Sequence, residues 1–352
     1  MRLTIIRHSI RNRGGDRLIL DYLSYLVQKD HEVVYWTNEI NTHFPIDAKI
    51  QIKQIPWRGV LGTIVFTLFK KFKTDIVLVD LVVMSVLAGI LNGKLVVYLA
   101  QDDDKTYYSS PYLRKLIDGF YRLSLSIMKT RVICVSEYLA GQLQKYSPHQ
   151  MSVVSNGIDP KKFYREGNPR FLSEKRNLAV IVLYARTDYR KGLDIGMKAI
   201  GELKRIRNSK DWELWTIGSD AANIYITEVN IKNWGGLKDN DLRAVLSTAD
   251  IFLSPSRHEG FGLMQLEAMA CVCAMVTTEA FTLVKNEFNA LVSPSEDWKS
   301  LAKNLNRILS DAILKQKLIS NAYSLLEEYN FDKSCEKFEK ELLSFDQIKK
   351  DN

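Results

Sequence analysis

The sequence predicts an α/β protein made of two doubly wound, Rossmann-like domains. Short, continuously apolar runs such as 76–80 and 178–185 alternate with segments of helical spacing. Runs of this kind are typical of parallel strands that are covered by helices on both faces. The alternation occurs twice, and a polar stretch with two prolines, 156–176, separates the two series. A chain of 352 residues is long enough for two domains of ordinary size.

The first half opens with a strand, a loop at 9–17 and a helix at 18–29, whose apolar residues recur at helical spacing. The apolar runs that we expect to form its strands are 2–8, 32–37, 76–80, 94–100, 131–136 and 151–155.

The second half repeats the pattern with strands at 178–185, 213–218, 250–255 and 272–277. Helices are expected at 192–206 and 239–249, and a third begins near Gly262 or Leu263. Two such domains in tandem predict a deep interdomain cleft, because ligands of doubly wound sheets bind at the carboxyl ends of the strands.

The composition excludes several classes of protein. With 46% hydrophobic and 26% charged residues the chain is globular. Its four cysteines form no C-x-x-C pair, which argues against a zinc site or a disulfide framework and favours a reducing cytoplasm. The most apolar region, 76–100, is broken by Asp80, Asn92 and Lys94 into pieces that are too short to span a bilayer.

The net charge of +8 is distributed unevenly. Residues 1–170 hold 24 Lys and Arg against 15 Asp and Glu, a balance of +9, whereas residues 171–352 hold 25 against 26, a balance of −1. A basic first half indicates an anionic partner such as phospholipid, a phosphate-bearing acceptor or nucleic acid. A general solubility charge is the alternative.

The segment 256–271 combines an anion site with two carboxylates. Gly260 and Gly262 precede a helix start, where free backbone N–H groups favour phosphate and glycine permits close approach. Glu259 and Glu267 suit hydroxyls instead, because an ionised carboxylate only accepts hydrogen bonds. Together they predict a nucleotide-sugar site. Alternatively, Glu259 caps the helix and Glu267 is a surface residue.

The longer segment 254–271 resembles the signature of glycosyltransferase family 4, which comprises retaining enzymes of the GT-B fold. The resemblance implies that Glu259 contacts the donor sugar and Glu267 the ribose hydroxyls. It also implies that the amides around Phe261, Gly262 and Leu263 face the donor diphosphate.

The segment 183–194 resembles the family's element after the first strand of the second domain. On that match Arg186 and Lys191 neutralise the donor diphosphate and stabilise the charge that develops on the leaving group. Two such cations remove the need for a metal, so no metal and no cofactor are expected. The alternative is that both are ordinary loop charges.

Other matches are weaker. Gly218 is expected in a turn at the end of a strand. One interpretation is that this glycine lets the base and ribose of the donor approach the backbone, and the other is that it only ends the strand. In the first half, the amides of Gly14 and Gly15 are expected to face the donor phosphates, and Asp102 is expected to hydrogen-bond a sugar. The acids 102–104 can also be read as a solvated loop. His258 is not expected to act as a base, since the departing phosphate oxygen can take the acceptor proton.

The family pattern fails after Thr278, where a glycine pair is expected and 279–282 reads EAFT. The family's A-C-G-x-P has become 270-ACVCA-274. Both departures lie beside the expected donor site, so the donor sugar and the activity itself stay open.

Residues 57–73 show apolar side chains at helical spacing, and the segment ends in a basic stretch that holds Lys70, Lys71 and Lys73. One interpretation is an interfacial membrane helix with a basic end. The other is a helix that covers the sheet, and both can hold at once.

We therefore expect an acceptor-binding domain at 1–160, with a helix at about 329–345 returning to it, and a donor-binding domain at 161–328. The predicted activity is retaining, metal-independent transfer of a sugar from a UDP, GDP or similar donor to an acceptor hydroxyl. The acceptor is expected to be anionic or lipid-linked, in cell-surface polysaccharide, lipopolysaccharide or glycolipid assembly. The expected location is the cytoplasm, with peripheral contact to the membrane.

Three alternatives follow from the same residues. A sugar-nucleotide epimerase shares the GT-B architecture, and a donor-binding protein without turnover would result if the loop after Thr278 blocks the sugar. An enzyme that glucosylates nucleic-acid bases needs an aromatic platform that this sequence lacks, so no nucleic-acid partner is expected.

Overall fold

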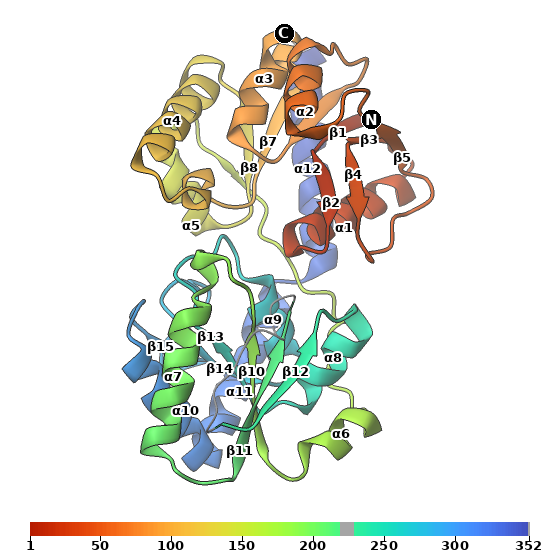
Figure 1. The fold of residues 1–352 in the computed structure, drawn as a ribbon. Coiled ribbons are helices and arrows are strands. Elements are labelled where there is room, and N and C mark those ends of the chain that lie inside the picture. The colour runs from red at the N-terminus through yellow and green to blue at the C-terminus, as the bar shows by residue number, and fades with distance from the viewer. Residues whose placement is uncertain (219–228, 351–352) are drawn as a thin grey trace. The chain divides into compact units, whose positions relative to one another are not determined.

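The computed structural model describes residues 1–218 and 229–350, which form two compact units. The first comprises Met1–Asn156 and Asp332–Asn352, and the second Gly157–Phe331. The division after Asn156 lies four residues before the predicted one at 160. Each unit is built around its own parallel sheet (Figure 1).

The sheet of the first unit has seven strands in the order β5-β3-β1-β6-β7-β8-β9, and every pair is parallel. Succeeding strands are added to one side of β1 and then to the other, so the order reverses between β1 and β6. The strands are β1 (Arg2–Ile6), β3 (Glu32–Thr37), β5 (Gln51–Gln54), β6 (Ile76–Val79), β7 (Val96–Ala100), β8 (Arg131–Cys134) and β9 (Ser152–Val153).

Helices cover this sheet because each buries an apolar stripe. Phe66 of α2 and Met84 of α3 pack on Ile6, Val77 and Val96 of the strands. The helices are α1 (Gly14–Gln28), α2 (Gly59–Phe69), α3 (Val82–Asn92), α4 (Pro111–Tyr121) and α5 (Glu137–Leu143), with a π-helical turn at Arg122–Ile127.

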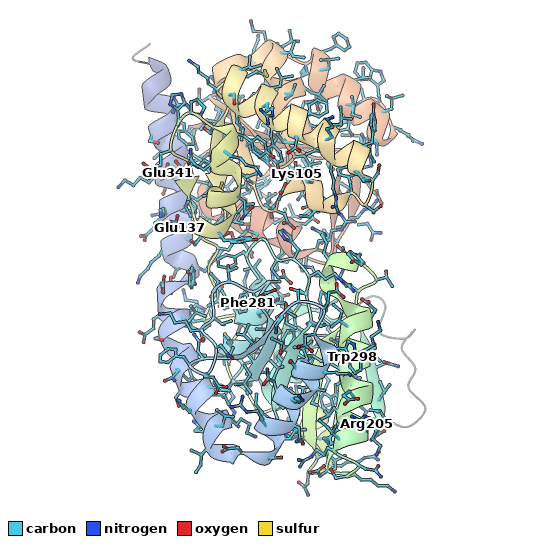
Figure 2. The ribbon with its side chains drawn as sticks, turned by 90° about the vertical axis from the view of Figure 1, so that its left-hand side faces the viewer. Lys105, Glu137, Arg205, Phe281, Trp298 and Glu341 are labelled. Carbon is cyan, nitrogen blue, oxygen red and sulfur yellow. The ribbon has the colours of Figure 1, made fainter. Side chains whose placement is uncertain are left out.

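The last helix, α12 (Phe331–Lys350), packs on the first unit from Asp332 onward. Its Phe338 stacks on Tyr22 of α1 with ring centroids 4.4 Å apart. Glu341 of α12, labelled in Figure 2, accepts a hydrogen bond from the Ser152 hydroxyl at 2.7 Å. These contacts are those of the predicted returning helix.

The predicted loop at 9–17 is wrong in two respects. Ser9–Arg11 forms a short strand, β2, which pairs with β4 (Glu39–Asn41). Helix α1 then begins at Gly14, four residues earlier than predicted, and the Arg17 amide closes its first turn on the Arg13 carbonyl at 3.0 Å. Asp16 lies in that first turn, where the helix dipole favours an acid.

The interpretation of 102–104 as a solvated loop is wrong for Asp104, whose exposed fraction is 3%. Its carboxylate accepts a hydrogen bond from the Val82 amide at 2.6 Å, at the N-terminus of α3. Burial raises the pKa of Asp104 well above its ordinary value, although this hydrogen bond opposes the shift. Asp104 therefore caps a helix.

The sheet of the second unit repeats the topology with six parallel strands in the order β12-β11-β10-β13-β14-β15. Here the order reverses between β10 and β13. The strands are β10 (Ala179–Tyr184), β11 (Trp212–Ile217), β12 (Ile231–Gly235), β13 (Ile251–Ser254), β14 (Ala274–Thr278) and β15 (Leu291–Ser293).

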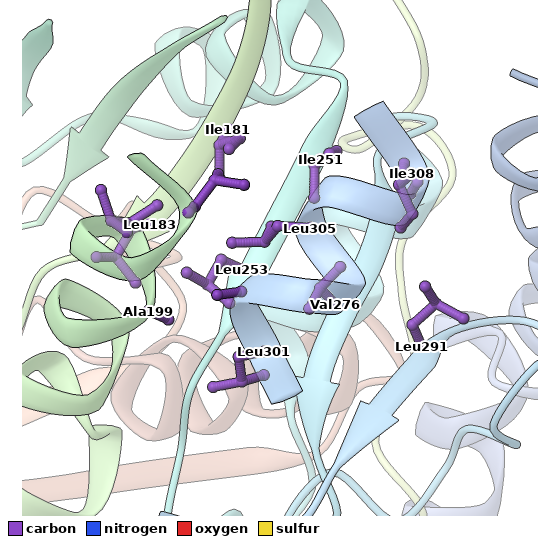
Figure 3. Packing of buried hydrophobic residues seen from close by; sticks show 14 of the residues in the cluster. Ile181, Leu183, Ala199, Ile251, Leu253, Val276, Leu291, Leu301, Leu305 and Ile308 are labelled. Atoms are coloured by element: carbon purple, nitrogen blue, oxygen red, sulfur yellow. The ribbon is translucent and has the colours of Figure 1, made fainter. Parts of the chain in front are cut away.

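The core of the second unit lies between this sheet and two of its helices. Figure 3 shows side chains of the strands, such as Leu253 and Val276, facing Ala199 of α7 and Leu305 of α10. The helices of the unit are α6 (Pro169–Lys175), α7 (Leu193–Ile206), α8 (Asp239–Thr248), α9 (Leu263–Ala270), α10 (Trp298–Ser310) and α11 (Ala312–Glu328).

Candidate functional site

Lys191 and Glu259 meet at the point where the strand order of the second unit reverses, and Arg186 lies in the same loop as Lys191. Residues 185–191 follow the carboxyl end of β10, and residues 255–262 follow the carboxyl end of its neighbour β13. In a doubly wound sheet this switch point is where ligands bind.

The two loops are joined through their backbones. The carbonyl of Arg190 accepts hydrogen bonds from the amides of Arg257, at 2.7 Å, and His258, at 3.2 Å. Gly192 has φ of +62°, and a Cβ atom there would lie 2.0 Å from the Pro255 carbonyl oxygen. Only glycine lets the first loop approach the second so closely, which brings Lys191 beside Glu259.

Glu259 is buried, with an exposed fraction of 9%, and accepts three hydrogen bonds. Lys191 Nζ lies 2.8 Å from Oε2, while Ser256 Oγ at 2.7 Å and Gln265 Nε2 at 3.0 Å share Oε1. Burial would raise the pKa of the Glu259 carboxyl, but Lys191 and these hydrogen bonds together lower it below its ordinary value. The carboxylate is therefore ionised at neutral pH.

Counting donors and acceptors shows what this pair can still bind. A carboxylate has about four acceptor positions, and three of those on Glu259 are taken. An ammonium has three donors, and Lys191 gives one of them to Glu259. One position for a hydroxyl and two for phosphate oxygens remain. Glu259 and Lys191 can therefore hydrogen-bond a sugar and a diphosphate while their ion pair stays intact.

Helix α9 begins directly after this loop. Gly262, its N-cap residue, has φ of +98°, and Leu263 is the first helical residue. Phe261 is buried and packs edge-on against Tyr329 at 5.5 Å between ring centroids. Glu267 lies one turn into the helix with an exposed fraction of 1%. Free amides at a helix N-terminus favour anions, so the first turn of α9 is a candidate anion site that follows Glu259 in the chain.

Gly218 and Arg186 lie at the ends of β11 and β10. Gly218 has φ of +108°, and a Cβ atom there would lie 2.6 Å from the Ala185 carbonyl oxygen. Its amide donates to the Gly235 carbonyl at 2.7 Å, so Gly235, which the sequence analysis did not single out, belongs to the same corner. Arg186 is half-buried beside Ala185.

The first unit has its own charged cluster at its switch point. Arg7, after β1, pairs with Asp16 at 2.6 Å and with Asp80, after β6, at 2.9 Å. None of the three was predicted as a site residue, although Arg7 and Asp80 lie at the ends of the predicted strands 2–8 and 76–80 and Asp16 follows the glycine pair. A Cβ atom on Gly15 would lie 2.6 Å from the Gln101 side chain.

Of the other residues predicted in the first unit, Gly14 is the exposed first residue of α1. Asp102 is half-buried, and its Oδ1 accepts the Asp103 amide at 2.9 Å. The expectations that Gly14 and Gly15 face donor phosphates and that Asp102 bonds a sugar stay predictions.

A pocket of about 600 Å³ opens at the carboxyl ends of β1, β3 and β5. Its polar and charged lining comprises His8, Asn38, Glu39, Gln54 and Arg58, and Ile55, Pro56 and Gly59 complete it. Glu39 is paired with Arg11 at 2.9 Å. Amides, imidazole and guanidinium can hydrogen-bond both hydroxyl and phosphate groups. The pocket is therefore a second candidate binding site, within the first unit.

Residues 1–218 and 229–350 contain no group of three or more His, Cys, Asp and Glu side chains arranged to hold a metal ion. None of the helices in this part of the chain combines the length and the hydrophobicity needed to cross a membrane.

Two family matches cover nearly the whole chain. Residues 12–162 match Glycosyltransferase Family 4, and residues 165–325 match Glycosyl transferases group 1. The chain belongs to glycosyltransferase family 4. This family 4 chain also has the GT-B fold, as do its neighbours among solved structures. One of them, the Anabaena protein HepE in complex with UDP and glucose, has a TM-score of 0.76 and 17% identity, covering 98% of this chain and 100% of HepE.

Two relatives illustrate the sequence similarity. An uncharacterized glycosyltransferase of Methanocaldococcus jannaschii is 22% identical over 231 residues, which are 63% of this chain and 62% of the relative. The UDP-Gal:α-D-GlcNAc-diphosphoundecaprenol α-1,3-galactosyltransferase of Escherichia coli is 29% identical over 227 residues, 57% and 56% of the two chains. The similarity thus spans less than two thirds of each relative's length.

We predict that Lys191→Met destabilises the family 4 chain by roughly 1–3 kcal/mol at neutral pH, because Glu259 is left buried without its cation. The substitution should also raise the pKa of Glu259. In the unmodified chain the pKa of Glu259 lies below its ordinary value. The ionised Glu259 therefore stabilises the fold at pH values above the ordinary pKa, and this stabilisation is lost as the pH falls through the folded-state pKa. In Lys191→Met the cation no longer offsets burial, so the ionised carboxylate destabilises the fold, and the stability deficit relative to the unmodified chain should shrink as the pH falls and Glu259 is protonated.

Urea unfolding at a series of pH values from neutral to acid measures both effects. The control is Lys198→Met, which removes an exposed lysine from α7 and should change neither. The double variant Glu259→Gln/Lys191→Met should be more stable than Lys191→Met alone, since no charge is then buried. If Lys191→Met is as stable to urea as the control, the ion pair does not contribute to stability and the prediction is wrong.

Proposed function

We propose that the chain is a retaining glycosyltransferase that uses a nucleotide diphosphate sugar without a metal ion. The observation that carries the proposal is the Glu259–Lys191 pair at the N-terminus of α9. Its unused acceptor position suits a sugar hydroxyl, and its unused donors and the adjacent helix amides suit a diphosphate. A ligand with both groups next to each other is a nucleotide sugar.

In the proposed reaction the bond between the anomeric carbon and the diphosphate oxygen breaks, while the acceptor hydroxyl oxygen bonds to that carbon on the same face. The acceptor proton passes to the departing phosphate oxygen, and the nucleoside diphosphate leaves. Lys191, Arg186 and the first amides of α9 stabilise the charge that develops on the leaving group. Glu259 orients the sugar, and its lowered pKa suits a hydrogen-bond acceptor that stays ionised.

The donor is assigned as a nucleoside diphosphate sugar, with Glu267 holding the ribose hydroxyls and the turn at Gly218 next to the base. The HepE structures with UDP, glucose and UDP-glucose support this class of donor, since HepE has the same fold. The sugar is not assigned, because the loop after Thr278 differs from the family pattern.

The acceptor is proposed to be anionic and lipid-linked, bound by the polar pocket at the start of α2. Arg58 and His8 in that pocket can pair with a phosphate of the acceptor, and Asn38 and Gln54 with its hydroxyls. The name of the Escherichia coli relative, which specifies a diphosphoundecaprenol-linked saccharide, supports this class of acceptor.

We further propose that α2, α3 and α4 form a membrane-contacting surface, here termed the three-helix face. α2 and α4 each pack against α3, so the three helices lie side by side (Figure 1). α2 buries Gly62, Thr63, Phe66 and Thr67 and exposes much of its apolar surface. The exposed apolar side chains of the face are Val60, Leu61, Phe69, Ile90, Leu91, Tyr112, Leu113 and Leu116.

The charge of the same segments favours an anionic surface. Residues 57–73 hold one Arg and three Lys and no acid, and residues 110–131 hold three Arg and two Lys against Asp118. Helix α2 ends at Phe69, so Lys70, Lys71 and Lys73 follow it instead of extending it as predicted. Apolar side chains flanked by Lys and Arg are the combination that binds anionic lipid headgroups.

The donor assignment predicts that a nucleoside diphosphate raises the melting temperature in EDTA, and that its sugar ester raises it further. Glu267→Ala should reduce the shift caused by the nucleoside diphosphate, because the ribose contact is lost. Glu259→Ala should mainly remove the additional shift caused by the sugar. Differential scanning fluorimetry with UDP, GDP, ADP and their glucose or mannose esters measures all of these shifts.

Glu328→Ala, an exposed glutamate at the end of α11, is the control and should retain every shift. If none of the nucleotides stabilises the unmodified chain, the transferase proposal fails. Stabilisation that requires a divalent metal would refute metal independence alone.

The membrane proposal predicts that the chain floats with vesicles that contain phosphatidylglycerol and not with vesicles of phosphatidylcholine alone. Leu61→Glu/Phe69→Glu should lose flotation, because both side chains are about two-thirds exposed or more and would bring acids to the lipid surface. Sucrose-gradient flotation followed by immunoblotting measures the bound fraction.

Ile313→Glu is the matched control, since Ile313 is 85% exposed on α11 of the second unit. It should float as the unmodified chain does. Equal flotation of the double variant would remove the three-helix face from the account, and no flotation of the unmodified chain would remove membrane contact altogether.

A further inference from the structure

Phe281 occupies an unusual place for a loop residue. It lies in the connection between β14 and β15, where the family pattern expects a glycine pair nearby, yet its exposed fraction is 1%. Its amide donates to the Thr278 carbonyl at 3.2 Å, which forms a turn directly after β14. The Phe281 side chain is labelled in Figure 2.

The ring of Phe281 packs directly on Gly262. A Cβ atom built on Gly262 would lie 2.6 Å from two carbons of the ring, well inside van der Waals contact. Gly262 is also the N-cap of α9 and has φ of +98°, a conformation that side chains other than hydrogen disfavour. The ring thus covers the one residue whose backbone conformation sets the direction of the first amides of α9.

The same loop also reaches the residues that hold Glu259. The Thr278 hydroxyl donates to the Ser256 carbonyl, and the Ser256 hydroxyl in turn donates to Glu259 Oε1 at 2.7 Å. Gln265, in the first turn of α9, bonds both Ser254 at 2.8 Å and Glu259 at 3.0 Å. The segment from Thr278 to Phe281 therefore contacts Ser256, which bonds the Glu259 carboxylate, and Gly262, which begins α9.

We propose that Phe281 is a positioning residue, which holds the Gly262 turn so that the first amides of α9 and Glu259 keep a fixed relative position. The proposal rests on the proposed function only for the identity of the ligand. A ring packed on the glycine removes the alternative turn conformations that glycine would otherwise populate. The loop that departs from the family pattern thereby acquires a role in binding the donor.

The primary test compares Phe281→Leu with Phe171→Leu, in which an equally buried phenylalanine of α6 is changed. Amide hydrogen exchange of peptides covering 260–270, measured by mass spectrometry below the melting temperature of both variants, reports the Gly262 turn directly. Faster exchange of the Leu266 amide, which bonds the Gly262 carbonyl, is expected in Phe281→Leu alone. Unchanged exchange would overturn the proposal whether or not a nucleotide binds.

The second readout is affinity for UDP, or for whichever nucleoside diphosphate stabilises the unmodified chain most. Phe281→Leu should weaken it by about tenfold or more, since small displacements of binding groups have large effects, and Phe171→Leu should not. Faster exchange with unchanged affinity would overturn the link to the donor. Absence of nucleotide binding to the unmodified chain would refute the proposed function, while the exchange result would still decide whether Phe281 holds the turn.

A pair of glycine variants isolates the ring contact. Gly262→Ala suffers both the strained φ and the clash with Phe281, whereas Gly262→Ala/Phe281→Ala retains only the strain. The alanine at 262 should therefore lower the melting temperature less in the Phe281→Ala background than in the unmodified chain. An equal decrease in both backgrounds would contradict direct packing of the ring on Gly262.

Discussion

The hydrogen-bonded ion pair between Glu259 and Lys191 is the interaction on which the rest of the candidate site depends. The two residues follow adjacent strands, β13 and β10, at the point where the strand order reverses. Gly192 permits the close approach of their loops, and the Arg190 carbonyl joins them through two amides. A buried carboxylate is costly without a cation, so the pair also fixes where Lys191 must lie.

The pair explains why carboxylates stand beside an anion site. Three of about four acceptor positions on Glu259 are used by its neighbours. We propose that the fourth accepts a hydroxyl and that the donors of Lys191 and the helix amides bind phosphate. Glu267 lies a full turn into α9, away from the first amides of the helix. In the proposed complex the anionic Glu259 accepts a hydrogen bond from a sugar hydroxyl, and the cationic Lys191 donates hydrogen bonds to the diphosphate.

The sequence indicated the residues of this candidate site but not the bond between Glu259 and Lys191. The run 254–271 has apolar positions at helical spacing, and strands β10 and β13 are continuously apolar, so α9 and both loops could be placed from local patterns alone. Glu259 and Lys191, however, are 68 positions apart, and their contact depends on the strand order. Strand β5 was missed because its residues, QIKQ, are polar at the edge of the sheet. Asp104 was misjudged because its capping of α3 is a contact across 22 positions.

The most direct test of the account is a crystal structure of the chain with the nucleoside diphosphate sugar that stabilises it most, grown in EDTA. The account predicts the diphosphate against the first amides of α9 and within hydrogen-bonding distance of Lys191, with a sugar hydroxyl on Glu259 and a ribose hydroxyl on Glu267. A diphosphate bound away from α9, or a donor that contacts neither carboxylate, would contradict it.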